Sequence, residues 1–341
     1  MDLQSVRDLK AVIRTELVQA DRARVMRAPA EPDRLGRAGP ARDVPAPAAP
    51  RAERDLVPAT VALGVAISGR RDYKLAIRLQ RTADKHHPTV ERMVGMAGGE
   101  VDLRYTGRVV KEQAPRWHQG ILRPLRIGGS VGHHAITAGT IGAFIRLDGV
   151  TAVLSNNHVL ANENRGALGD AVYQPGPADG GTAGEQVATL SKFVRLRRRG
   201  NGVDAAAATV VDGINTDHRR IRGIGRLAGL GALPDIGDPV RKTGRTTGTR
   251  RGIVTAIELD NLVVGFDIGD LSFDGQIEIE GTGRNGFSDG GDSGSLIVDG
   301  DRLAVGLLFA GSSQGGSNGR GLTYANPIEP VLQELGATLM F

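Results

Sequence analysis

The sequence predicts a mainly β protein whose strands form a barrel or sandwich, preceded by an N-terminal helix and a small α/β domain. Three observations support this fold class. From about residue 131, short apolar runs alternate with turn residues; the chain holds 49 glycines, which suit tight turns; and residues 2–27 repeat apolar positions at helical spacing.

Residues 1–27 are predicted to contain one amphipathic helix. Its apolar positions recur at three- and four-residue steps, at Leu3, Val6, Leu9, Ile13, Leu17 and Ala20. Two interpretations stay open: the helix docks on its own protein, or it binds a protein partner or a second copy of the chain. A membrane-surface helix is disfavoured, because no aromatic residue anchors the apolar face.

Residues 28–59 are rich in Pro and Ala, and this density of Pro predicts an extended linker. Residues 60–130 are predicted to form a small α/β accessory domain and a connector. Strands are expected at 61–67, 74–79 and 101–110, with a short helix at 90–94. The run 74–79 alternates polar and apolar residues, which predicts a half-buried strand.

Residues 131–341 are predicted to form one β domain. The expected strands cover 142–147, 150–154, 187–190, 205–211, 252–259, 262–266, 276–280, 296–298 and 303–309. Turn residues separate them, as expected for a barrel or sandwich. A terminal helix is expected at 327–335, beginning near one of its prolines.

Composition narrows the class and the compartment. The formal net charge of +5 does not specify a nucleic-acid partner. Hydrophobic residues make up 40% of the chain, which is typical of a soluble globular protein. The chain has no Cys, which favours a reducing compartment. The charged N-terminus lacks the apolar run of a signal peptide, and no segment is apolar enough to span a bilayer. We therefore predict a cytoplasmic protein without membrane association.

The strongest local motif is Asp-Gly-Gly-Asp-Ser-Gly-Ser at residues 289–295. A nucleophilic Ser needs an exposed hydroxyl and converging backbone N–H groups, and Gly on either side permits the required turn. The N–H groups of Gly291 and Ser293 would then hold the oxyanion formed when Ser293 attacks a carbonyl. A plain β-turn is the alternative for this motif taken alone.

A Ser hydroxyl needs a base, and a His base needs a carboxylate to orient it. His158 follows an apolar strand and precedes another apolar pair, unlike the other six His residues. Asp204 leads directly into an apolar run, where a carboxylate must be hydrogen-bonded. Asp170 and Asp212 are the competing carboxylates.

The order His158, Asp204, Ser293 resembles the trypsin/chymotrypsin-like serine protease superfamily over roughly residues 131–341. The segment 242–248 looks like the start of the second barrel in bacterial members. The segments 154–162, 174–176 and 179–181 look like a bacterial and plant branch that includes the plant narrow-leaf proteases. The resemblance implies two six-stranded antiparallel barrels with a catalytic triad in the cleft between them.

The resemblance also implies a substrate site. The pocket floor would be Phe287, six residues before the nucleophile, and the wall strand would include Phe309, Ala310 and Gly311. The absence of an acid at position 287 argues against a preference for Arg or Lys. The wall strand is expected to pair with an extended substrate backbone.

Animal members of the superfamily are activated when a freed N-terminus pairs with the Asp before the nucleophile, which is Asp292 in this chain. The similar start, around Ile136, lies deep inside the sequence. We therefore predict that the intact chain is competent and that Asp292 has an internal partner.

Together these motifs predict an intracellular serine endopeptidase that acts on a protein or peptide substrate, without a cofactor and without a metal. The alternative is a protease-fold scaffold or adaptor whose triad is idle or gated and whose N-terminal region binds a partner. A nucleic-acid-binding module is a distant third hypothesis.

Overall fold

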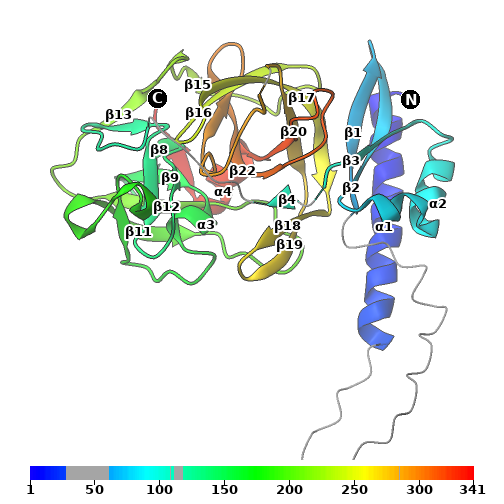
Figure 1. Cartoon of the computed structure of the whole chain (residues 1–341), viewed down its shortest axis with the longest axis horizontal. Coiled ribbons are helices and arrows are strands. Elements are labelled where there is room, and N and C mark those ends of the chain that lie inside the picture. Colours follow the sequence, from blue (N-terminus) through cyan, green and yellow to red (C-terminus); the bar gives the residue numbers. More distant parts are fainter. Residues whose placement is uncertain (28–60, 108, 111–117, 284) are drawn as a thin grey trace, which may run out of the picture.

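The computed structural model describes residues 1–27, 61–107, 109–110, 118–283 and 285–341; at 17–27 and at Val110 it describes the backbone alone. The linker expected at 28–59 lies outside these residues. The described chain is mainly β, and Figure 1 shows two strand-rich bodies side by side, with an N-terminal helix and a small sheet next to the second body.

Six antiparallel strands form a closed ring, the second barrel. Each strand pairs with the next and the last pairs with the first, so the sheet closes on itself. In ring order the strands are β16 (Pro239–Gly244), β17 (Gly248–Asp260), β20 (Gln276–Gly281), β23 (Thr323–Pro327), β22 (Leu303–Ser312) and β21 (Leu296–Val298).

The first barrel is a curled sheet, and the two bodies together are the trypsin-like double barrel that the resemblance implied. Its strands run in the order β24 (Ala337–Leu339), β8 (Ala143–Leu147), β9 (Val150–Ser155), β12 (Ala206–Val210), β11 (Gln186–Phe193), β10 (Ala171–Tyr173), β6 (Ser130–His133) and β7 (Gly139–Thr140). The predicted terminal helix is present as α4 (Ile328–Leu335), whose apolar face completes the core of this barrel.

Short elements connect the two barrels and extend their edges. A small sheet contains β5 (Leu125–Ile127), β13 (Thr216–Ile221) and β14 (Gly225–Arg226). The single turn α3 (Asn157–Leu160) follows β9, and 3-10 turns lie at Pro177–Asp179 and Ala183–Glu185. The second barrel carries β15 (Gly229–Leu230) and a hairpin of β18 (Leu262–Phe266) and β19 (Gly269–Phe273).

The N-terminal unit shares a sheet with the second barrel. It consists of α1 (Leu3–Arg27), β1 (Val61–Gly69), β2 (Asp72–Leu79), a 3-10 turn at Thr82–His86, α2 (Pro88–Met96) and β3 (Val101–Tyr105). β1 pairs antiparallel with β17, so the sheet β1-β2-β3 continues the barrel wall. The helix α1 lies along this sheet in Figure 1.

α1 docks on its own chain through an apolar stripe and a row of cations. Val6 and Ile13 are buried in the core formed with β1 and β2. Lys10 and Arg14 both lie 3.4 Å from Asp260 at the end of β17. The described side chains therefore favour the self-docking interpretation of this helix. No helix in the described part of the chain is long and apolar enough to cross a membrane.

The strand β2 is buried on both faces at its end, and the prediction of a half-buried strand at 74–79 is wrong. Arg78 is 1% exposed, with Nε 2.7 Å from Oε2 of the fully buried Glu278 in β20. Burial alone would lower the pKa of the Arg78 guanidinium, but the Glu278 carboxylate beside it holds that pKa above its ordinary value. A buried ion pair thus replaces the solvent face that alternation predicted.

The strand predicted at 101–110 is divided in the structure. β3 ends at Tyr105, and a separate two-residue strand, β4 (Val109–Val110), pairs with β18 and β22 of the second barrel. Gly107 lies between them with φ of 68°, a left-handed conformation that interrupts an extended strand.

Candidate active site

His158 lies in the turn α3, directly after the strand β9. Its Nδ1 is 2.5 Å from Oδ2 of Asp204, which is fully buried just before β12. The carboxylate accepts the hydrogen bond, so Nδ1 carries the hydrogen, and in the neutral imidazole the lone pair is then on Nε2. Nε2 is buried and has no hydrogen-bond partner among the described residues. It is therefore available to accept a proton.

Asp204 is held by groups from both barrels. Its Oδ1 accepts the backbone N–H groups of Asn157 at 2.7 Å and His158 at 3.3 Å. Its own N–H donates to Oδ1 of Asn326 in β23 at 3.0 Å, and its carbonyl accepts from Nδ2 of Asn156 at 2.8 Å. These bonds satisfy a buried carboxylate that would otherwise be costly. They also fix its orientation toward the imidazole.

The competing carboxylates lie elsewhere. Asp170 Oδ2 is 2.8 Å from Nε2 of His133, and this hydrogen bond lowers the pKa of the Asp170 carboxyl. Asp212 is exposed. Of the three candidate carboxylates, Asp204 is the one that the structure brings to His158.

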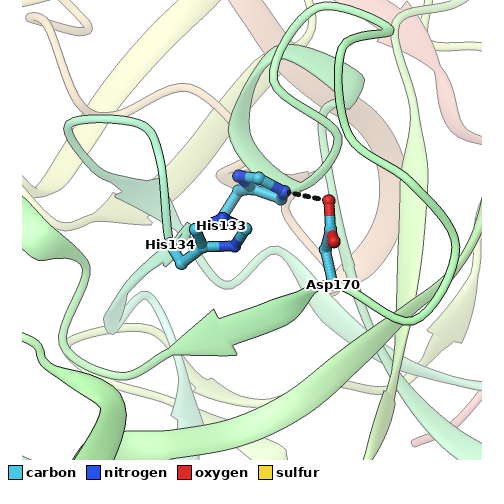
Figure 2. Close-up of side chains that lie close together, drawn as sticks. All are labelled: His133, His134 and Asp170. Carbon is cyan, nitrogen blue, oxygen red and sulfur yellow. Dashed lines mark hydrogen bonds and ion pairs between the residues drawn. The ribbon is translucent and has the colours of Figure 1, made fainter.

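His133, His134 and Asp170 form a close cluster of potential metal ligands, shown in Figure 2. Nδ1 of His133 accepts the backbone N–H of Ala135 at 3.1 Å, so its Nε2 is the nitrogen that donates to Asp170. Both ring nitrogens are thereby engaged, which leaves His133 no free lone pair for a metal ion. The hydrogen bond between His133 and Asp170 therefore links β6 to the loop before β10.

The Ser293 loop packs directly against the segment that carries His158. The Ser293 carbonyl accepts the N–H of Thr140 at 2.8 Å. A Cβ added at Gly139 would lie 2.4 Å from Cγ2 of Val159 and 3.0 Å from the Ser293 carbonyl oxygen. Gly139 therefore allows Val159, the residue after His158, and the Ser293 backbone to lie against one backbone position, with no side chain between them.

The hydrogen bonds of two carbonyls in this loop fix the direction of the backbone N–H groups of Gly291 and Ser293. Each of these N–H groups shares a peptide plane with the carbonyl of the residue before it. The Gly290 carbonyl accepts from Oγ1 of Thr246, and the Asp292 carbonyl accepts the N–H of Ser295 at 2.9 Å. In a trans peptide the N–H points opposite to the C=O, so the N–H groups of Gly291 and Ser293 point away from these partners. Neither donates to a group in the described residues. They are the donors predicted to hold an oxyanion.

Asp292 has the internal partner that was predicted for it. Its Oδ2 lies 2.5 Å from Nζ of Lys242 in β16, and both side chains are fully buried. Its Oδ1 accepts the N–H groups of Thr246 at 2.9 Å and Thr247 at 3.1 Å. The Lys242 ammonium supplies a counter-charge to Asp292 from within the chain, so this carboxylate is paired without a new N-terminus.

Replacing Lys242 with Met should distort this loop. The change leaves Asp292 buried without a counter-charge, which costs about 3–5 kcal/mol of folding free energy. Losing the alignment of one oxyanion donor should also lower kcat by roughly 10²-fold or more. Thermal unfolding and ester hydrolysis measure the two effects. The double variant K242M/D292N, which removes both charges, should recover part of the stability; no recovery would contradict the pairing.

A second buried ion pair supports the same loop and was missed by the sequence reasoning. Arg245 binds Asp179 through Nε and Nη2, each at 2.5 Å, and Asp179 also accepts from Oγ of Ser130 at 2.5 Å. An added Cβ at Gly291 would lie 2.2 Å from Nη1 of Arg245, so this guanidinium lies beneath the oxyanion turn. Both segments were noted in the sequence, but no local pattern indicates that they pair.

His118 is a buried histidine beside the Asp292–Lys242 pair. Burial, together with the cations Arg222 and Lys242, lowers the pKa of His118 to about 4. The Asp292 carboxylate raises this pKa and offsets part of the decrease. The unfolded chain binds this proton with a pKa of about 6.5, so acid favours unfolding.

Stability should therefore fall as the pH drops from about 6.5 toward 4, because only the unfolded chain protonates His118 in this range. The measurement is the Tm of the wild type and of His118→Gln between pH 7 and pH 5. The variant should lose less Tm over that interval. Equal losses would show that His118 does not contribute to the acid sensitivity.

The residues predicted to bind substrate are covered. Phe287 is 1% exposed and belongs to the core of the second barrel with Val254. Phe309 and Ala310 lie on β22, 1% and 2% exposed, and Gly311 is buried beside them. Their role in substrate binding stays a prediction. The strand β4 of the same chain pairs with β22 at Gly311 and Ser312.

The similarity of this chain to known proteins lies in its fold. No protein-family model matches the chain, and no curated protein sequence does. The structures it is similar to include Cellulomonas bogoriensis chymotrypsin, 22% identical, covering 64% of this chain and 99% of that one with a TM-score of 0.45. Nocardiopsis protease is 19% identical over 64% and 100% of the two chains, with a TM-score of 0.45. Thermobifida fusca protease A is 20% identical over 64% and 99%, also with a TM-score of 0.45.

Proposed function

We propose that the chain is a serine endopeptidase in which Ser293 is the nucleophile, His158 the general base and acid, and Asp204 the group that orients His158. The observation that carries this proposal is the available Nε2 of His158, on an imidazole fixed 2.5 Å from a buried carboxylate, next to the Ser293 loop. The two N–H groups of that loop without a partner support it further.

Acylation begins when Nε2 of His158 takes the hydroxyl proton of Ser293 as Oγ bonds to the substrate carbonyl carbon. The carbonyl π electrons move to oxygen, and the N–H groups of Gly291 and Ser293 stabilise the oxyanion. Asp204 stabilises the imidazolium through Nδ1–H. The imidazolium then protonates the leaving amine as the C–N bond breaks, which leaves an acyl group on Ser293.

Deacylation repeats these steps with water. His158 removes a proton from a water molecule as the water oxygen attacks the acyl carbon. The N–H groups of Gly291 and Ser293 hold the second oxyanion. Return of the proton to Oγ of Ser293 breaks the acyl–oxygen bond and releases the carboxylic acid. The residues of this chain supply every proton transfer in the cycle.

The test is a pre-steady-state burst with a p-nitrophenyl ester. An active triad should release about one p-nitrophenol per chain before steady turnover, because the acyl-enzyme accumulates. Ser293→Ala should show no burst. A scaffold with an idle triad, the alternative function, would give no burst in the wild type either. The cytoplasmic location and any partner of α1 remain predictions from the sequence.

A further inference from the structure

β4 is added to the sheet of the second barrel between β18 and β22. Val110 pairs antiparallel with Gly311 of β22 and parallel with Gly265 of β18, and Val109 pairs with Ser312. The Val109 N–H donates to Oε1 of Gln80 at 3.3 Å. The Val109 side chain is fully buried in the cluster that includes Phe309 and Ala310. The chain's own residues thus cover the predicted substrate wall.

The edge of β22 that β4 occupies is the edge that leads to Ser293. At Gly311 the opposite edge is already paired with Thr323 of β23, so Val110 lies on the other one. Further along that edge β22 pairs with β21, and the Leu308 carbonyl accepts the N–H of Gly294 at 2.8 Å. Three residues of extended strand, about 10 Å, separate Gly311 from Leu308.

The direction of β4 also matches the geometry that a substrate needs. Antiparallel pairing of Val109 with Ser312 and Val110 with Gly311 means that β4 runs from the Ser312 end of β22 toward its Leu308 end. An extended peptide that adds to this edge and presents a carbonyl to Ser293 must use the same N–H and C=O groups of Gly311. β4 and such a peptide exclude each other.

The strand on the other side of β4, β18, contacts His158. Val110 is paired with Gly265, and the ring of the next residue, Phe266, lies edge-on to the His158 ring with centroids 5.7 Å apart. β4 therefore lies between β18 and β22, the two strands that flank the approach to His158 and Ser293.

We propose that β4 is a built-in competitor of extended peptide substrates, so that the docked chain reacts with small acyl reagents but is slow on peptides that must pair with β22. This inference rests on the proposed peptidase function. Among the described residues, two form the strand, which gives few ladder bonds to break. Displacement or release of β4 then opens the site without unfolding the barrel. Regulation then acts on strand pairing and leaves the triad intact.

The experiment compares the full-length wild type with Val109→Gly, which removes a buried side chain of β4, and Gln80→Ala, which removes the acceptor of its N–H. The matched control is Val101→Gly, the same change in β3. Three rates are measured: labelling by a small fluorophosphonate, hydrolysis of an N-acetyl amino-acid ester, and hydrolysis of fluorogenic peptides with at least four residues before the cleaved bond.

Val109→Gly and Gln80→Ala should raise kcat/KM for the long peptides, by about tenfold or more for Val109→Gly, because weakening a competing state raises the open fraction. Labelling and ester hydrolysis should stay within about twofold. Val101→Gly should change none of the three. If Val109→Gly fails to fold, shown by lost labelling, the milder Gln80→Ala decides.

Normal labelling with unchanged peptide hydrolysis in the folded β4 variants would overturn the proposal. Absence of labelling and of ester hydrolysis in every protein, including the wild type, would instead be a failure of the peptidase function on which it rests.

Discussion

Substituting Ser293 or His158 by Ala should each lower kcat for a short peptide or ester by about 10⁶-fold. Without Oγ there is no atom to form the acyl-enzyme, and without Nε2 the hydroxyl stays protonated and weakly nucleophilic. Steady-state kinetics on the purified variants measures the loss. Ser313→Ala, a change at an exposed serine of the second barrel, is the matched control and should leave kcat unchanged.

The double variant S293A/H158A should be no slower than either single variant, since the two groups act in one step and their effects do not add. Residual activity of Ser293→Ala within tenfold of the wild type would show that hydrolysis uses a different nucleophile. Additive losses in the double variant would show that His158 acts elsewhere than on Ser293.

Asp204→Asn should lower kcat by about 10⁴-fold while the fold is retained. Oδ1 of residue 204 accepts two backbone N–H groups, so the Asn side chain keeps its oxygen there and turns its amide toward Nδ1 of His158. An amide donor at Nδ1 moves the ring hydrogen to Nε2, and the imidazole then has no lone pair to accept the Ser293 proton.

Asp170→Asn and Asp212→Asn are the controls for this assignment, because they were the competing carboxylates. Asp170 contacts His133 and Asp212 is exposed, so each should change kcat by less than about twofold, the effect of a distant surface charge. A larger loss for Asp170→Asn than for Asp204→Asn would overturn the choice of carboxylate.

The residues of the proposed catalytic triad could be picked out in the sequence because each of them has a local cause. Gly291 and Gly294 adopt φ of 85° and 92°, which a side chain disfavours, so the glycines around Ser293 report a required turn. His158 and Asp204 lie at the ends of apolar runs, where a polar side chain is costly unless it is hydrogen-bonded. The order of the three motifs then indicated the double barrel that the structure has.

The supports of the site could not be predicted in the same way, because they are pairings between distant segments. Lys242 and Asp292 are 50 residues apart, and Arg78 and Glu278 are 200 apart. Residues of this kind usually face solvent, so local patterning assigns them to surfaces. The pairing of β1 with β17 likewise has no signature within either strand.

The register of β4 is a further case of long-range pairing. Two valines in a short run predict a strand but not its partner, and the sequence interpretation joined them to β3. Their pairing with Gly311 and Ser312 changes the expectation for the intact chain. The Lys242–Asp292 pair supports a nucleophile that needs no cleavage before Ile136, whereas β4 limits which substrates can reach it.

The most direct test of the central claim is to treat the intact chain with a small fluorophosphonate and to map the modified residue by mass spectrometry. A working Ser293 attacks phosphorus and displaces fluoride, so the account predicts one phosphonyl group per full-length chain, on Ser293, and none in His158→Ala. A label on another residue, no label, or a label confined to a fragment that begins near Ala135 or Ile136 would contradict it.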